Sequence, residues 1–115
     1  MNKNPIIFVK DILDYIETVE KYIKDINKNH FFEKDLIHNA TIRCIEVIGE
    51  AANNIPKEIQ RKYPDVVWSD IVGTRNILIH AYTGVNLEVI WGIAKKDLKA
   101  LKKQMLKIKK DLEKD

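Results

Sequence analysis

Residues 37–52 read IHNATIRCIEVIGEAA, and this stretch decides the fold. Its apolar residues recur at spacings of three and four, which is the period of an α-helix. Because they fall on more than one side, the pattern predicts a centrally packed helix from about Glu33 to Asn54. The two apolar rows are Ile37, Ala40, Cys44, Ile48, Ala51 and Ile42, Ile45, Ala52.

The same predicted helix also carries a row of polar residues. Its members keep the three-four spacing, so they share one face, and they are Asn39, Arg43, Glu46, Glu50 and Asn53. Gly49, beside Ala51 and Ala52, leaves room for a neighbouring helix to approach closely.

Helical patterns flank this centre on both sides. Pro5 favours a helix start, and an apolar stripe runs from Val9 to Ile26 before Asn27-Lys28-Asn29 breaks it. Pro56 opens a short helix that stops before Pro64, and Ser69 is a good N-cap for a fourth helix that ends before Gly84. Asn86 caps a fifth, whose seam is Leu87, Trp91, Ala94, Leu98, Leu101, Met105, Ile108 and Leu112.

These elements predict one all-α domain over residues 1–115, an antiparallel bundle of about five helices with a long Lys-rich helix from about residue 86. The seam is typical of packing against the first helix. Four Gly and three Pro in 115 residues are too few turns for a many-stranded sandwich or barrel.

Charge and cysteine content narrow the class of protein. The formal net charge is +3, and residues 95–115 hold nine Lys against four acids, so the excess lies in the last helix. Cys44 is the single cysteine, which excludes an intrachain disulfide and fits a small buried residue. No stretch approaches the roughly 20 apolar residues of a membrane span and none resembles a secretory signal, so we expect a cytoplasmic protein with no membrane contact.

Common cofactor and metal motifs are absent. The sequence has no Gly-rich phosphate loop, no Cys pair and no His-Glu-x-x-His, and its three His do not fall at helical metal-ligand spacings. His30 is expected in a turn and His38 at the start of the central helix, where solvated or capping roles are typical. We expect neither a metal nor a cofactor.

The densest cluster of reactive side chains lies in residues 73–82, GTRNILIHAY. Asn76 and His80 are four apart and share a helix face, whereas Arg75 and His80 are five apart, roughly 140° around the helix. Either the long Arg75 side chain reaches around, or two copies of the helix meet. The cluster also has structural interpretations: His80 favoured by the helix dipole, Arg75 paired with a carboxylate such as Glu50, and Asn76 a satisfied polar group.

This cluster resembles the motif of the HepT group of HEPN-domain proteins, in which Arg, four residues, His, any residue and Tyr follow one another. Arg75, His80 and Tyr82 fit, with Asn76 after the Arg as is frequent in the group. The resemblance covers most of the chain, although the basic segment after Lys95 is less characteristic. Further matches in order and spacing are Arg43, Ile48-Gly49-Glu50-Ala51, Ile55-Pro56, Tyr63-Pro64, Trp68 and Val89-Ile90-Trp91.

The resemblance implies a toxin that is a metal-independent endoribonuclease, acting as a homodimer on RNA, with tRNA as one candidate. His80 would be the general base or acid, Arg75 would stabilise the phosphate charge, and Asn76 would orient His80 or a phosphate oxygen. Arg43 and Glu50 would support these residues from the central helix, or they belong to an ordinary charge stripe.

The resemblance also implies control by an MntA-type nucleotidyltransferase antitoxin, which would silence the toxin by AMPylation of Tyr82. Tyr82 could instead be an aromatic anchor at a helix end. Two other functions stay open: a non-catalytic helical partner that contributes to the transferase's nucleotide site, and a basic RNA binder that does not cleave.

Overall fold

The computed structural model describes residues 4–73 and 86–114, and helices with short connections account for all of this part of the chain. The predicted all-α class is therefore confirmed. The elements are α1 (Pro5–Ile23), α2 (Lys28–Glu33), α3 (Asp35–Asn54), α4 (Lys57–Lys62), a helical segment at 68–73, α6 (Leu87–Gly92), the π-helical η1 (Ile93–Asp97) and α7 (Leu98–Glu113).

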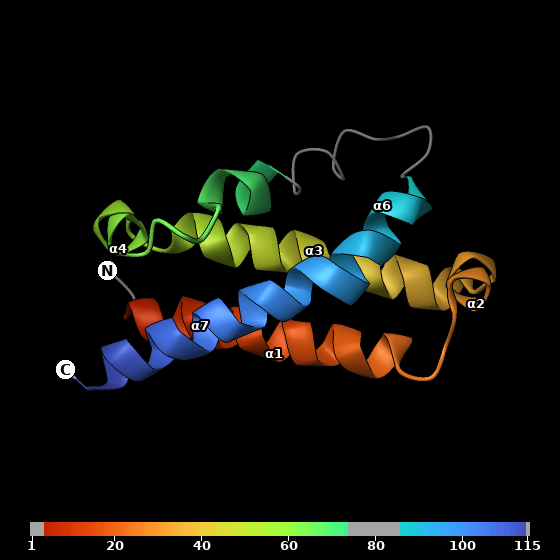
Figure 1. Cartoon of the computed structure of the whole chain (residues 1–115), viewed down its shortest axis with the longest axis horizontal. Coiled ribbons are helices and arrows are strands. Elements are labelled where there is room, and N and C mark those ends of the chain that lie inside the picture. The colour runs from red at the N-terminus through yellow and green to blue at the C-terminus, as the bar shows by residue number, and fades with distance from the viewer. Residues whose placement is uncertain (1–3, 74–85, 115) are drawn as a thin grey trace.

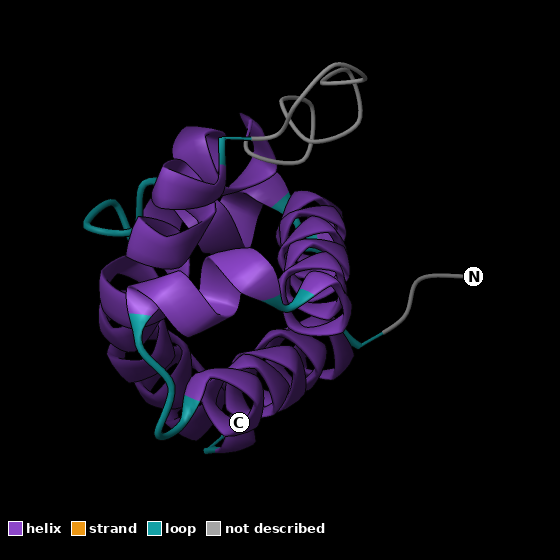
Figure 2. Cartoon of the chain, turned by 90° about the vertical axis from the view of Figure 1, so that its right-hand side faces the viewer, coloured by secondary structure: helices purple, strands orange, loops and turns teal. Residues whose placement is uncertain are grey.

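The bundle is built around two antiparallel helices, α1 and α3, which lie side by side (Figure 1). The elements α6, η1 and α7 form one rod that crosses them diagonally and brings α7 against α1. Seen from the end of the bundle, the helices surround a common interior (Figure 2). That interior holds the apolar stripes predicted from the sequence, and the single-domain assignment stays a prediction.

Helix α1 follows its predicted stripe over most of its length. The Asn4 side chain accepts a hydrogen bond from the Ile6 amide at 3.2 Å, and Pro5 occupies the first turn. The residues Val9, Ile12, Ile16, Val19 and Ile23 are buried. The predicted extension to Ile26 is wrong, because the backbone leaves the helix after Ile23 and Asp25 adopts a positive φ of 64°.

Helix α2 was not predicted. The polar run at Asn27 reads as a break, yet the Asn27 side chain accepts from the His30 amide at 2.8 Å and starts a new helix. Phe31 is wholly buried against Trp91, with ring centroids 5.1 Å apart, and this packing holds so short a helix in place. His30 therefore lies in a helix rather than in a turn.

Helix α3 is the central helix that the opening stretch predicts. One side of it buries Thr41, Cys44, Ile48 and Ala52, and the small residues Gly49 and Ala51 are buried as well. Thr41 satisfies its hydroxyl by donating to the Ile37 carbonyl at 2.8 Å. The predicted polar row faces outward: Asn39, Arg43, Glu50 and Asn53 are exposed and Glu46 is half-buried.

The seam of the last helix is confirmed from Ala94 to Ile108 and shifted before that. Ala94, Leu98, Leu101, Met105 and Ile108 are buried, but in α6 the buried residue is Ile90 instead of the predicted Leu87 and Trp91. The π-helical turn of η1 accommodates one extra residue, so the buried face changes register across it. Asn86 caps α6 as predicted, accepting from the amides of Glu88 and Val89.

Ser69 does not cap the fourth helix. The amides of Asp70 and Ile71 donate to the Val67 carbonyl, so helical structure already begins at residue 68 and Ser69 lies inside the first turn. Within the described residues, no helix combines the length and apolar content that a bilayer crossing requires.

Candidate functional site

The predicted catalytic cluster falls in residues 74–85. Arg75, Asn76, His80 and Tyr82 lie outside the described residues, so their roles stay predictions. The structure describes instead the two helical segments that enclose this stretch in the chain, at 68–73 and at α6. Both lie along the same side of α3 (Figure 1).

The segment before the cluster is anchored by Trp68. Its indole N–H donates to the carbonyls of Gln60 and Tyr63, both at 3.1 Å, and its side chain is buried. Because both acceptors lie on or just after α4, the start of the 68–73 helix is tied to α4. A buried indole N–H needs a hydrogen-bond acceptor, so these two carbonyls fix the orientation of the Trp68 ring.

A buried amide ties α4 in turn to the end of α3. The Gln60 side chain donates to the carbonyls of Ala52 at 3.3 Å and Ile55 at 2.9 Å. The last carbonyls of a helix need donors from outside it: Gln60, itself buried, is the donor to the C-cap residue Ile55, and it adds a second donor to Ala52, which also accepts from the Ile55 amide at 3.2 Å. The chain that leads into the candidate cluster is thus connected to the central helix by side-chain hydrogen bonds.

The segment after the cluster is anchored by apolar packing and charge. Ile90 is only 2% exposed, and Trp91 stacks at a tilt on Phe31 of α2. Glu88 forms an ion pair with Lys28 at 2.7 Å. Both described ends of the candidate stretch are therefore fixed to the bundle by contacts that the sequence pattern alone did not show.

Arg43 and Glu50 are placed by α3 but are not brought together. Arg43 Nη1 pairs with Glu46 Oε2 at 3.2 Å, three residues along the same helix, and the Arg43 side chain is 69% exposed. Glu50 is exposed on the same outward row. The pair with Glu46 is the ordinary charge stripe considered above, and the supporting role of both residues stays a prediction.

His30 and His38 both lie at the α2–α3 corner. His30 is exposed, whereas His38 Nδ1 lies 3.0 Å from the Phe31 carbonyl and Nε2 lies 3.5 Å from Asp35 Oδ1. His38 thus holds two helices together rather than facing open space. Among the described residues, no three His, Cys, Asp or Glu side chains gather as a metal site would require.

Cys44 is buried, as the sequence predicted. Desolvation raises the pKa of its thiol, and the nearby Arg43 charge only partly opposes that effect. A buried thiol with a raised pKa is a poor nucleophile, so Cys44 belongs to the core.

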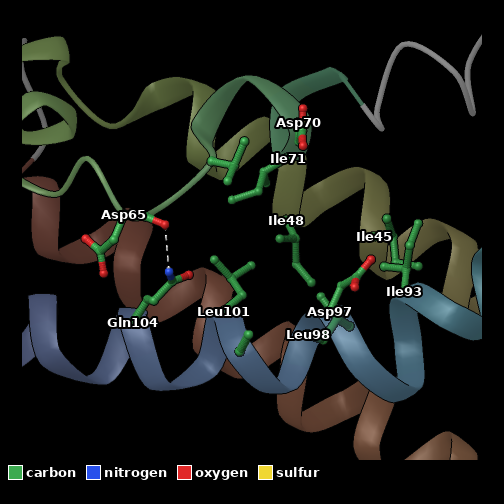
Figure 3. A pocket seen from close by; sticks show the side chains of 12 residues that line it. Ile45, Ile48, Asp65, Asp70, Ile71, Ile93, Asp97, Leu98, Leu101 and Gln104 are labelled. Carbon is green, nitrogen blue, oxygen red and sulfur yellow. Dashed lines mark hydrogen bonds between the residues drawn. The ribbon is translucent and has the colours of Figure 1, made fainter.

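A groove of about 330 Å³ opens between α3, the 65–71 segment and the η1–α7 rod (Figure 3). Its floor is aliphatic, with Ile45, Ile48 and Leu101 among the lining residues. Gln104 Nε2 closes one end by donating to the Asp65 backbone carbonyl at 3.1 Å. No sequence pattern predicted this groove, because its lining comes from three segments that are far apart in the chain.

The described lining of the groove is apolar and acidic. Among the described residues, three acidic side chains line it, Asp65, Asp70 and Asp97, and no Lys or Arg does. Carboxylates repel phosphate at this range, and an aliphatic floor offers it no hydrogen bonds.

Comparisons with known proteins identify the family. The model of the family described as "Ribonuclease HepT-like" matches residues 12–108. A Methanocaldococcus jannaschii protein named "Putative RNase MJ0125" is 42% identical over 106 residues, which cover 92% of this chain and 91% of the relative. "Probable ribonuclease HepT" of Thermococcus cleftensis is 36% identical over 103 residues, 90% of this chain and 94% of the relative.

One relative is much longer than this chain. "Gamma-glutamylcyclotransferase and putative RNase MJ0434" of Methanocaldococcus jannaschii is 41% identical over 115 residues, all of this chain but only 52% of the relative. The chain thus spans about half the length of that protein. No solved structure gave a match.

Proposed function

Because the chain belongs to the HepT-like ribonuclease family of HEPN-domain proteins, we propose that it is an endoribonuclease whose catalytic residues are Arg75, Asn76 and His80. The observation that carries the proposal is the family match over residues 12–108, which includes all three positions. Relatives that match over about nine tenths of their own length are named as ribonucleases.

The proposed reaction is an internal transesterification of RNA. The ribose 2′-oxygen attacks the adjacent phosphorus, the bond from phosphorus to the 5′-oxygen breaks, and a 2′,3′-cyclic phosphate end results. A base takes the 2′-hydroxyl proton and an acid gives a proton to the departing 5′-oxygen, so no redox partner is needed. Imidazole titrates near neutral pH and can fill either role, which suits His80.

Arg75 and Asn76 would act on the phosphate. Two non-bridging oxygens gain negative charge as the 2′-oxygen attacks, and the planar guanidinium of Arg75 offers paired donors to them. Asn76 shares a helix face with His80 by sequence spacing and would orient it or hold a phosphate oxygen. None of these steps requires a metal ion, so we propose activity in the presence of EDTA.

The proposal includes a homodimer. Arg75 and His80 are poorly aligned within one helix, and a second copy facing the first would supply each His80 with an Arg75 from the opposite chain. The anchors at Trp68 and Trp91 support this role, because they hold to the bundle the two helical segments on either side of the stretch that would face the partner. Light scattering at micromolar concentration should give a dimer, and a monomer would contradict it.

We further propose a toxin role with control at Tyr82. An MntA-type nucleotidyltransferase antitoxin with ATP and magnesium would activate the phenol, because a tyrosine hydroxyl is ordinarily protonated at neutral pH. The phenolic oxygen would attack the α-phosphorus of ATP, pyrophosphate would leave, and AMP would stay attached. The added phosphodiester would occupy Arg75 and repel RNA.

The test of the ribonuclease is the chemistry of its products. Wild-type protein, incubated with RNA in EDTA, should give cyclic phosphate ends, and Arg75→Ala or His80→Ala should form them at least about a hundredfold more slowly. Cleavage that requires magnesium would overturn the mechanism. If no RNA is cleaved although the chain binds the transferase, the non-catalytic partner is the better description.

The test of control at Tyr82 uses a matched pair of tyrosines. Tyr82→Phe should cleave RNA and resist silencing by the transferase, whereas Tyr15→Phe on α1, which removes an exposed phenol far away in sequence, should be silenced normally. Peptide mass spectrometry should find AMP on Tyr82 alone. AMP on a different residue would refute this part of the proposal.

A further inference from the structure

The outward face of the α6–η1–α7 rod carries a row of lysines. Their spacings of three and four keep them on one side of the helix, and all are exposed. The row follows the buried seam at an offset of two residues, roughly 200° around the axis, so it lies opposite the face that packs on the bundle. We call it the lysine row; its members are Lys96, Lys99, Lys103, Lys107, Lys110 and Lys114.

Acidic side chains do not neutralise the lysine row. Within the described part of the chain, the lysines of the rod that form salt bridges are Lys102, with Glu20 at 2.9 Å, and Lys109, with Glu113 at 3.4 Å, and both lie half-buried beside the row. In the row itself, Lys107 lies over the Tyr63 ring at 5.8 Å. None of the six lysines of the row forms a salt bridge among the described residues.

Such an arrangement is unfavourable for the isolated helix. Lysines at i and i+4, such as Lys99 with Lys103 and Lys110 with Lys114, repel each other along the helix surface. The acids of α7 are engaged elsewhere: Asp111 accepts from the Tyr63 hydroxyl at 2.8 Å and Glu113 pairs with Lys109. A row of one sign on a stable helix, without a salt bridge to any described acidic residue, is what a surface that meets a polyanion presents.

We infer that the lysine row binds the phosphate backbone of the RNA substrate; this inference rests on the proposed ribonuclease function. From Lys96 to Lys114 the row extends about 27 Å at 1.5 Å per residue, which suits an extended polyanion better than a single phosphate. Lysines are flexible point charges, so they hold a backbone without reading its bases. The row would therefore supply affinity, and the residues of the 73–82 cluster the chemistry.

A lipid surface fits the row less well. Helices that lie on membranes insert an apolar face, and the apolar face of α7 is already buried in the bundle. On α7 the large apolar side chain that is exposed is Leu106, at 48%. One such residue beside the row offers too little apolar area to insert.

The test measures binding without cleavage. In a His80→Ala background, the row variant Lys99→Gln/Lys103→Gln/Lys110→Gln is compared with a control, Lys10→Gln/Lys21→Gln/Lys24→Gln. The control removes the same charge from exposed lysines on and just after α1. Fluorescence anisotropy with a labelled single-stranded RNA of about 20 nucleotides gives Kd over a range of salt concentrations. Circular dichroism checks that both variants are folded.

The row variant should weaken RNA binding roughly tenfold or more at low salt, and the control by less than about threefold. Its slope of log K against log salt should fall by about 2, since each phosphate contact to a single strand contributes about 0.7. Replacing the same three lysines by Arg should preserve binding. Equal losses in the row and control variants, no loss in either, or binding to anionic vesicles in preference to RNA would overturn the inference.

The two proposals fail in different ways. If the wild type binds RNA through the row but cleaves none, the ribonuclease proposal fails and the lysine row stands. If the wild type cleaves and the row variant binds RNA as tightly as the control, the row is excluded and the ribonuclease proposal stands.

Discussion

The two faces of α7 differ in composition and in burial. The inner face is a seam of Leu98, Leu101, Met105 and Ile108, buried against the bundle, while the outer face is the lysine row. The same helical period generates both, displaced by about half a turn. The comparison teaches that one element can hold the fold together with one face and leave the other free for a partner.

The largest effect on stability should come from the seam. Met105 is fully buried, so Met105→Ala should lower the free energy of unfolding by about 2–5 kcal/mol through lost burial and a residual cavity. The adjacent Leu106 is 48% exposed, and Leu106→Ala should cost less than about 1 kcal/mol. Urea denaturation of the two variants measures the free energy of unfolding and so compares a buried and an exposed position that are adjacent in the sequence. Equal losses would mean that the seam is not the packed side.

A smaller effect is expected from the hydrogen bonds that lead into the candidate site. Gln60→Ala removes the side-chain donor to the Ile55 carbonyl and the second donor to the Ala52 carbonyl, which keeps the Ile55 amide. The variant should lower the free energy of unfolding by about 1–3 kcal/mol, because the Ile55 carbonyl loses its side-chain donor. Arg61→Ala, at an exposed position next to it, is the matched control and should change stability by less than about 0.5 kcal/mol. Thermal unfolding followed by circular dichroism measures both. If Gln60→Ala is as neutral as the control, the anchor does not stabilise this end of the bundle.

The smallest effect on stability should come from the lysine row. Replacing Lys99, Lys103 and Lys110 by Gln removes like-charge repulsion and leaves the seam untouched, so the free energy of unfolding should stay within about 0.5 kcal/mol of wild type. Any gain should shrink as salt is raised, since salt screens exposed charges. A decrease in the free energy of unfolding of more than about 1 kcal/mol would contradict this prediction, because it would mean that the outer face stabilises the fold.

The long helices could be predicted from the sequence, because an apolar stripe of many residues at three-four spacing fits an α-helix and no other secondary structure. Helices α1, α3 and α7 each bury a row at three-four spacing, and the Asn86 cap follows from its side-chain chemistry. The sequence did not predict the short elements, because tertiary contacts determine whether and where they form. Phe31 holds α2 by packing on Trp91, the indole of Trp68 fixes the helix that Ser69 was expected to begin, and the turn at η1 shifts the register by one residue.

The features of the candidate site likewise differ in whether the sequence could predict them. The cluster at Arg75 and His80 stood out as the densest group of reactive side chains, and a family resemblance supplied its proposed roles. The family itself is confirmed by the match over residues 12–108. The lysine excess was visible as net charge, but its gathering on one exposed face needed the structure. The acidic groove had no signature in the sequence, because Ile45, Asp65 and Gln104 come together only in the folded chain.

The ribonuclease assignment is tested most directly by single-turnover cleavage of RNA in EDTA, with wild type and His80→Ala side by side. We expect the wild type to leave 2′,3′-cyclic phosphate ends and His80→Ala to cleave about 10²- to 10⁴-fold more slowly, as the loss of a general acid or base implies. The variant should still bind RNA through the lysine row. Cleavage by His80→Ala at the wild-type rate would contradict the account.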